Sequence, residues 1–155
     1  MARIVEVGDK GVTHRDAVAE TTISMTRQAC ARLIEGTAKG DALEAARVAG
    51  IMAVKRTPDL LPFCHPVAIT GAEVTADPDP ETGRIRVRAT VRASDRTGVE
   101  MEALTAAAVA ALCLYDAAKP FDRSAVISNL RLLHKRGGKS GDYRLEESAV
   151  RDEPG

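Results

Sequence analysis

The alternation of apolar and polar residues along the chain predicts three helices and four strands. Residues 98–119 are dominated by Ala, Leu, Met and Glu, with no interior Gly or Pro, which predicts one long helix. One flank of this helix is mostly alanine, so we expect it to pack closely on a sheet. The residues of that flank are Ala103, Leu104, Ala107, Ala111, Leu114 and Ala118.

Alternation with a period of two marks the strands. Residues 84–93 alternate Ile, Val and Ala with Arg and Thr and form the cleanest strand, and weaker patterns predict strands at 17–25 and 124–135. Residues 67–76 form a further strand with a bulge at Gly71, and this strand pairs with 84–93 as a hairpin. The arginines of the hairpin are most simply a solvated face, with a subunit contact as the alternative.

Two shorter helices are predicted between the first two strands. Thr26 is expected to cap the first of them, and Asp41 the second, which runs to about Arg56 and is stopped by Pro58. Gly50 lies inside the second helix, where it costs about 1 kcal/mol relative to Ala. We therefore expect a close packing contact at this glycine.

The order of strand, two helices, two strands, helix and strand is the split βαβ arrangement with an extra helix. It predicts an α+β, ferredoxin-like fold in which a four-stranded antiparallel sheet is covered by helices on one face. The 155 residues suit a single domain. Residues 1–16 are expected to be a flexible N-terminal arm, and residues 144–155 a flexible C-terminal tail.

Composition argues against several classes of protein. The formal net charge is zero and the pI is about 6.8, so no overall field draws the chain to nucleic acid or to a membrane. Aromatic residues make up only 3% of the chain, which leaves few platforms for stacking bases. We expect no membrane-spanning segment and no signal peptide. The three cysteines show no metal-binding spacing and indicate reduced thiols in a cytoplasmic protein.

A carboxylate and an ammonium group share one face near the end of the long helix. Asp116 and Lys119 are three residues apart and therefore point the same way. They form either a solvated ion pair, which is common and weak, or an acid/base pair at the mouth of a site. Lys39 just precedes a predicted helix start, where it is either a surface lysine or a contact to an anion such as phosphate.

Two loops carry further candidate chemistry. Three prolines in residues 58–66 exclude regular structure, so Cys64 and His65 lie in a rigid and partly buried loop. No second ligand pair stands at zinc spacing, and we expect no metal. His65 has either a structural role or a role in contacting substrate.

The second loop contains Gly138-Lys139-Ser140, which resembles the end of a phosphate loop but lacks its first glycine, because Leu133 stands at that position. The segment does not lead into a helix, so it is not a nucleotide-triphosphatase loop. As a glycine-rich turn beside Lys135 it either offers backbone amides to a phosphate or forms part of a flexible tail.

The length of the main helix constrains the site. Glu102 and Asp116 are fourteen residues apart, hence about 21 Å along the helix axis. A single small substrate could hardly contact both of them in one copy of the chain. If both are functional, the site takes them from two copies.

Six short segments, taken together and in their order along the chain, indicate a family. Any one of them is a weak signal, and the six are Lys39-Gly-Asp41, Ala45-Ala-Arg-Val-Ala-Gly-Ile51, Phe63-Cys-His-Pro66, Thr97-Gly-Val-Glu-Met-Glu-Ala-Leu-Thr-Ala106, Tyr115-Asp116 with Lys119, and Lys135-Arg-Gly-Gly-Lys-Ser-Gly141. Together they resemble the cyclic pyranopterin monophosphate synthase family, also called the molybdenum cofactor biosynthesis protein C family. The resemblance covers about residues 4–143.

This resemblance implies a phosphorus–oxygen lyase of early molybdenum cofactor biosynthesis. The reaction implied is the rearrangement of (8S)-3′,8-cyclo-7,8-dihydroguanosine 5′-triphosphate to cyclic pyranopterin monophosphate, with release of pyrophosphate. No metal or organic cofactor is implied. The chain would be a single catalytic domain, assembled as a homohexamer of three dimers with active sites between subunits.

By position, the resemblance implies catalytic roles for Asp116, Lys39 and Lys119. The implied substrate contacts are Phe63, Cys64, His65, Met101, Glu102 and Lys135, with Arg15 and Lys55 as looser matches. The chain departs from the family's usual pattern at Phe63, at the run Ala117-Ala-Lys-Pro120 and at Arg136. None of these departures removes a catalytic group.

Two rival functions belong to other classes. A non-catalytic, small-molecule-binding ferredoxin-like module would tolerate the loss of Asp116 and Lys119. An RNA-recognition domain would need exposed aromatic residues on its sheet. All four aromatic residues are predicted to lie off the strands; they are Phe63, Tyr115, Phe121 and Tyr143.

Overall fold

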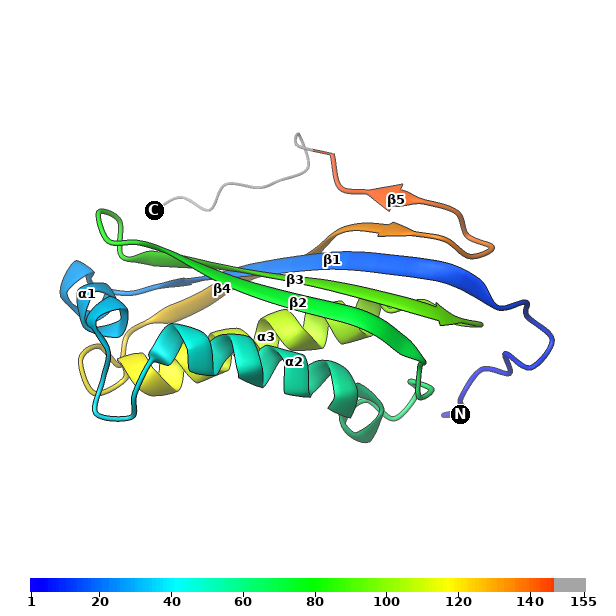
Figure 1. The fold of residues 1–155 in the computed structure, drawn as a ribbon, viewed down its shortest axis with the longest axis horizontal. Helices are drawn as coiled ribbons and strands as arrows, with labels where there is room; N and C mark the ends of the chain where they lie inside the picture. Colours follow the sequence, from blue (N-terminus) through cyan, green and yellow to red (C-terminus); the bar gives the residue numbers. More distant parts are fainter. Residues whose placement is uncertain (147–155) are drawn as a thin grey trace.

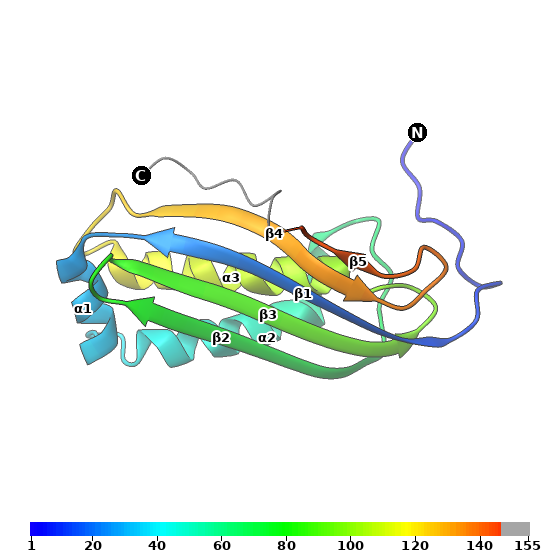
Figure 2. The same cartoon turned by 90° about the horizontal axis from the view of Figure 1, so that it is seen from above.

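The computed structural model describes residues 1–146, which form three helices and five strands (Figure 1). The elements are β1 (Thr13–Ser24), α1 (Arg27–Glu35), α2 (Ala42–Leu60), β2 (Ile69–Asp79), β3 (Arg84–Asp95), α3 (Glu100–Ala118), β4 (Val126–Arg136) and β5 (Tyr143–Arg144). The strands make one antiparallel sheet in the order β2-β3-β1-β4-β5. All three helices lie on the same face of the sheet (Figures 1 and 2). The predicted α+β class and split βαβ order are therefore confirmed.

The hydrophobic core lies between the sheet and the long helix α3. Every second residue of β3, from Ile85 to Ala93, is fully buried, as the alternation predicted. The alanine flank of α3 is buried as well, apart from Leu104, which is half-buried. Small side chains on this flank let the helix axis approach the strands closely. The predicted packing of the helix on a sheet is confirmed.

The close contact expected at Gly50 is present where α2 crosses its neighbours. A Cβ atom added to Gly50 would lie 3.0 Å from a methyl group of Val74 on β2 and 3.1 Å from the backbone oxygen of Ala106 on α3. Both distances are tighter than ordinary van der Waals contact. Glycine is therefore retained in this helix because it allows the three elements to meet.

Charged side chains cover the sheet face that the helices leave open. Glu20 accepts from two arginines, with its carboxylate oxygens 3.4 Å from Arg88 Nη2 and 2.8 Å from Arg131 Nη2. Arg136 Nε lies 3.1 Å from both carboxylate oxygens of Asp16, whose side chain is only 5% exposed. The arginine stripe of β3 is thus exposed in the single chain, and Glu20 of β1 pairs with one of its members, Arg88.

Three predicted boundaries are wrong. β1 begins at Thr13 rather than Ala17, so residues 13–16 belong to the sheet and not to an N-terminal arm. α2 continues past Pro58 to Leu60, because a proline in the last turn removes one hydrogen bond while the Leu61 N–H still donates to Thr57 at 2.9 Å. The expected bulge at Gly71, by contrast, is confirmed by a register shift there.

The third error concerns the C-terminal end of the sheet. Tyr143 and Arg144 pair with Lys135 and His134 as the short fifth strand, whereas four strands were predicted and Tyr143 was placed off the sheet. A two-residue strand is too short to show an alternating pattern. The predicted tail began at residue 144, yet the Leu145 N–H still donates to the Leu133 carbonyl at 2.7 Å. Residues 147–155 lie outside the described residues.

The helix α3 has the length and composition of a membrane span, which the sequence interpretation overlooked. Among residues 1–146 it is the one helix that is both long enough and apolar enough to cross a membrane. Half of this apolar stretch is nevertheless buried inside the protein. Its hydrophobic side chains are accounted for by contact with the sheet and α2. The helix is therefore a core helix.

Candidate functional site

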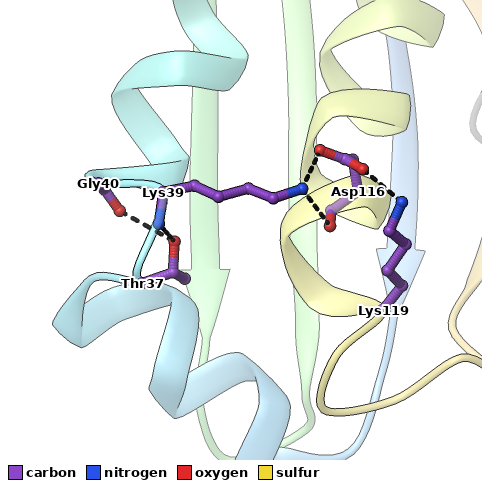
Figure 3. A network of polar contacts seen from close by, with 5 residues as sticks. All are labelled: Thr37, Lys39, Gly40, Asp116 and Lys119. Atoms are coloured by element: carbon purple, nitrogen blue, oxygen red, sulfur yellow. Dashed lines mark hydrogen bonds and ion pairs between the residues drawn. The ribbon is translucent and has the colours of Figure 1, made fainter.

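Three charged side chains meet at the C-terminal end of α3 (Figure 3). The Asp116 carboxylate lies between two ammonium groups, with Oδ2 2.6 Å from Lys39 Nζ and Oδ1 2.7 Å from Lys119 Nζ. About half of each side chain is exposed to solvent. The structure thus brings together the three residues that were expected to be catalytic. We call Lys39, Asp116 and Lys119 the charged cluster.

Two separate parts of the chain build this cluster. Lys39 comes from a tight turn between α1 and α2, in which Thr37 and Gly40 exchange two backbone hydrogen bonds of 2.9 Å. The Thr37 hydroxyl also donates to the Gly40 carbonyl at 3.2 Å (Figure 3). Thr37 Oγ1 also accepts from the Lys39 N–H at 3.2 Å, and the φ angle of 106° at Gly40 favours glycine. The Asp41 side chain then caps α2, as predicted. Asp116 lies in the last turn of α3, and Lys119 is the residue that caps the C-terminal end of this helix.

The chain leaves α3 through a turn that is tied to α1. The Asp122 carboxylate accepts from the Thr26 N–H at 2.9 Å, and the Tyr115 hydroxyl donates to the Arg123 carbonyl at 2.8 Å. These bonds fix the backbone that carries Lys119. The cluster therefore has an ordered frame although its side chains face solvent.

The two lysines control the charge state of Asp116. Hydrogen bonds from Lys119 and then Lys39 lower the pKa of Asp116 to about 2, so the carboxylate is ionised at neutral pH. One negative and two positive charges leave the cluster with a net positive charge, which suits a phosphate group. Cys113 lies one turn earlier on α3, and its pKa is raised by burial and by the Asp116 carboxylate.

A second group of candidate residues surrounds the N-terminal end of α3. The Glu102 side chain is only 3% exposed. Burial raises the pKa of Glu102 to about 7, and the neighbouring Glu100 carboxylate adds to this effect. Glu102 can therefore exchange a proton near neutral pH, which Asp116 cannot do within the single chain.

The loop that follows α2 faces the same end of α3. Burial and then the Glu102 carboxylate raise the pKa of the Cys64 thiol. The Cys64 N–H donates to the Leu61 carbonyl at 3.1 Å, which fixes a turn in the loop. Phe63 is 56% exposed and Met101 is 41% exposed, so one chain alone does not provide the burial expected for this loop.

His65 follows Cys64 and is half-buried in the same loop. Within residues 1–146, no three His, Cys, Asp or Glu side chains lie close enough together to hold a metal ion. A role for His65 in contacting substrate stays a prediction.

Lys135 lies near the same end of α3 and lines a cavity of about 570 Å³. Its side chain is 17% exposed, and its Nζ lies 3.5 Å from Glu100 Oε1 and 2.5 Å from Ser140 Oγ. The cavity is open to solvent, and its apolar lining consists of Leu132, Tyr143 and Leu145. The residue types around it combine apolar walls with convergent polar groups, as in many small-molecule sites.

The two looser candidates differ in their surroundings. Arg15 is 9% exposed and donates to the backbone oxygens of Asp95 and Arg96 at 3.2 and 3.3 Å, so it holds the end of β3 in place. Lys55 is exposed on α2. The sequence interpretation named neither Glu100 nor Ser140 as a partner of Lys135. Position in the first turn of the long helix was the one available signal for Glu100.

Within one chain, the candidate residues form two groups at opposite ends of α3. The uninterrupted helix places Asp116 about 21 Å from Glu102 along its axis. Figure 1 shows this separation, because the turn before α2 and the loop after α2 lie at opposite ends of the molecule. The charged cluster is thus assembled as expected, whereas it does not meet the loop with Cys64 and His65.

Fold and site together define a class of protein. It is a small α+β protein with the split βαβ order, carrying a charged cluster of net positive charge and a carboxylate whose pKa is raised to about 7. The MoaC family matches residues 4–138, and the chain belongs to this family.

Three relatives illustrate how similar the chain is to other members. The cyclic pyranopterin monophosphate synthase of Pelotomaculum thermopropionicum is 52% identical over 143 residues, which cover 92% of this chain and 84% of that protein. The protein of the same name from Parvibaculum lavamentivorans is 53% identical, with coverages of 94% and 91%. The one from Brucella ovis is 49% identical, with coverages of 96% and 91%.

Proposed function

We propose that the chain catalyses the reaction named by its relatives, at a site built from two copies of the chain. It is a cyclic pyranopterin monophosphate synthase, a lyase of molybdenum cofactor biosynthesis. The substrate is (8S)-3′,8-cyclo-7,8-dihydroguanosine 5′-triphosphate. The products are cyclic pyranopterin monophosphate and pyrophosphate.

The observation that carries this proposal is the charged cluster. An internal hydroxyl of the substrate attacks the innermost phosphorus, a new P–O bond forms, and the bond to pyrophosphate breaks. Lys39 and Lys119 hold the triphosphate and stabilise the charge that develops on its oxygens. Asp116 keeps the two ammonium groups 2.6 and 2.7 Å from its own oxygens and thereby sets their spacing.

Opening the purine ring and closing the pterin ring require proton transfers, for which Glu102 is suited. A catalytic acid or base works best when its pKa lies near the working pH, and the pKa of Glu102 is raised to about 7. Asp116, with its pKa lowered to about 2, is a weak base unless a second chain covers the cluster and removes it from water.

A site between two chains resolves the separation of the two groups. The charged cluster of one copy would face the loop with Phe63, Cys64 and His65 of another copy. Exposed Phe63 and Met101, which lack cover in the single chain, would be buried in such a contact. We propose a homohexamer of three dimers as the assembly and the cytoplasm as its location.

Mixing two inactive variants tests the shared site. Lys119→Ala damages the cluster and His65→Ala damages the loop, so each homo-oligomer should be nearly inactive. After joint unfolding and refolding in equal amounts, random assembly leaves about a quarter of the sites with both parts intact. Recovery of activity toward that fraction supports the shared site. No recovery, with both variants shown to co-assemble, places the whole site within one chain.

The activity itself has a direct test. Pure protein is mixed with the cyclised dihydro-GTP, and pyrophosphate and the cyclic-phosphate pterin are quantified. Production of both supports the synthase. Tight binding of the substrate without turnover would favour the rival function, a non-catalytic binding module.

A further inference from the structure

The glycine-rich segment 137–141 has a feature that the proposed function does not use. In a phosphate loop the serine hydroxyl faces a bound ion. Here the Ser140 hydroxyl instead lies 2.5 Å from the Lys135 ammonium group, five residues earlier in the chain. The hydroxyl oxygen therefore accepts a hydrogen bond from the residue that is expected to contact substrate.

The surroundings of Lys135 show why such a partner matters. A lysine side chain is long and flexible, so its ammonium group occupies one position only when partners hold it there. The ammonium group has three donors. Ser140 Oγ takes one, and Glu100 Oε1 lies 3.5 Å from the same nitrogen. At least one donor remains for a substrate oxygen in the cavity of about 570 Å³ that all three residues line.

The backbone fixes the position of Ser140 independently of Lys135. The Gly137 N–H donates to Asp142 Oδ1 at 3.2 Å, and the Gly141 N–H donates to the Gly138 carbonyl at 3.2 Å. Gly137, Gly138 and Gly141 have φ angles of 93°, 84° and 73°, which other residues rarely adopt. The turn is thus closed by its own hydrogen bonds, so Ser140 is a fixed acceptor and the lysine is the part that it orders.

We propose that Ser140 is a positioning residue, whose hydroxyl together with the Glu100 carboxylate holds the Lys135 ammonium group in the cavity for contact with substrate. The inference rests on the proposed function, since it assumes that Lys135 contacts the substrate. A neutral hydroxyl suits this role, because it orders the ammonium group without cancelling its positive charge. Binding of a phosphate by the turn is therefore not needed to explain the serine.

A double-mutant cycle separates this role from direct contact between Ser140 and the substrate. The variants are Ser140→Ala, Lys135→Met and both together, assayed by pyrophosphate release. Ser140→Ala should lower kcat/KM about tenfold, as expected when a hydrogen bond to a charged group is lost. Ser140→Thr keeps the hydroxyl and should restore most of the activity. In the Lys135→Met background, Ser140→Ala should have no further effect.

The matched control is Ser94→Ala, since Ser94 is an exposed serine near the C-terminal end of β3 and does not line the pocket around Lys135. Its kcat/KM should stay within about twofold of the wild type. Additive losses in the cycle would overturn the proposal, because Ser140 would then act on the substrate or an ion directly. Equal activity of Ser140→Ala and the wild type would overturn it as well.

A measurement without turnover distinguishes failure of this inference from failure of the proposed function. If the wild type releases no pyrophosphate, the synthase proposal fails, and the rate at which Lys135 is acetylated by an N-hydroxysuccinimide ester tests the positioning alone. Ser140→Ala should raise this rate several-fold by freeing the amine, with the rate at exposed Lys10 unchanged. Equal rates at Lys135 in the two proteins would overturn the positioning role.

Discussion

The two ends of α3 carry two carboxylates in opposite states. Asp116 is 52% exposed and lies against two ammonium groups, which lower its pKa to about 2. Glu102 is 3% exposed and has a carboxylate neighbour, and its pKa is raised to about 7. The same functional group on the same helix is thus a permanent anion at one end and a proton carrier at the other.

The difference follows from what surrounds each group rather than from the residue type. At the C-terminal end, nearby positive charge favours the ionised form. At the N-terminal end, loss of water favours the neutral form, even though the helix dipole favours negative charge there. One end of the helix is therefore suited to hold a polyanion, and the other to move a proton.

The largest expected effect is at the charged cluster. Asp116→Asn keeps the shape of the side chain but removes the negative charge that spaces Lys39 and Lys119. We expect turnover to fall by about 10²–10³-fold, as when a preorganised contact to the transition state is lost, while KM changes little because both lysines remain. Steady-state kinetics of pyrophosphate release gives both parameters.

A matched control uses another exposed aspartate with an ion pair. Asp59 lies 3.5 Å from Arg56 at the end of α2, and its side chain is 66% exposed. Asp59→Asn should leave turnover within about twofold of the wild type. If the turnover of Asp116→Asn were as close to the wild type as that of Asp59→Asn, the ionised state of Asp116 would have no role in catalysis.

The next largest effect concerns the pH dependence of stability at Glu102. Its ordinary pKa of 4.5 applies in the unfolded chain and the value of about 7 in the folded chain. Between these values the folded state holds more protons, so its free energy of unfolding falls as the pH rises from about 4.5 to about 7. The contribution of Glu102 to this fall is about 3 kcal/mol. Below pH 4.5 the contribution of Glu102 to the free energy of unfolding is constant.

Urea unfolding of Glu102→Gln at fixed protein concentration tests this sign. The amide is always neutral, so the variant should gain stability relative to the wild type as the pH is raised from 4 to 8. Glu44→Gln is the control, because the Glu44 side chain is 61% exposed. A constant difference between Glu102→Gln and the wild type across this range would show that Glu102 is ionised in the folded protein.

The contrast also shows what the sequence can and cannot predict. Spacing along a helix placed Asp116 beside Lys119, and the turn chemistry before Asp41 placed a lysine near a helix start. That Lys39 contacts Asp116 depends on how α2 packs on α3, which no local pattern contains. The burial of Glu102 likewise depends on distant parts of the chain, so its raised pKa is visible only in the structure.

The errors in the fold have similar causes. A proline usually ends a helix, but Pro58 lies in a last turn that is held by tertiary packing, where Thr57 is fully buried. The strand β5 has two residues, and its pairing with β4 depends on the turn at 137–142. In both cases contacts between distant residues outweigh the local propensity.

A smaller effect is expected where α2 meets α3. Gly50→Ala gains about 1 kcal/mol of helix propensity, but its methyl group would lie 3.1 Å from the backbone oxygen of Ala106. Moving the two helices apart costs about 1–3 kcal/mol, so we expect a net loss of about 1 kcal/mol.

Because Lys39 precedes α2 while Asp116 belongs to α3, this shift should also disturb the charged cluster. Urea unfolding and kcat measure the two consequences. Gly11→Ala, which meets nothing within 4 Å, is the control for the added methyl group. An unchanged stability of Gly50→Ala would show that α2 and α3 separate at no cost. The distance between these helices would then not determine the geometry of the charged cluster.

The smallest effect uses a cysteine at each end of the helix as a reporter. The Asp116 carboxylate raises the pKa of Cys113, and the Glu102 carboxylate raises the pKa of Cys64, in each case after the larger effect of burial. Removing either carboxylate should therefore increase alkylation of its own cysteine, since the thiolate is the reactive form. At pH 8, where Glu102 is largely ionised, Asp116→Asn should speed iodoacetamide labelling of Cys113 by a few-fold and leave Cys64 unchanged. Glu102→Gln should do the reverse. Mass spectrometry of timed digests measures the labelling of both cysteines in one sample, so each cysteine is the control for the other. If one substitution accelerated the labelling of both cysteines equally, the two ends of α3 would be electrostatically coupled rather than separate.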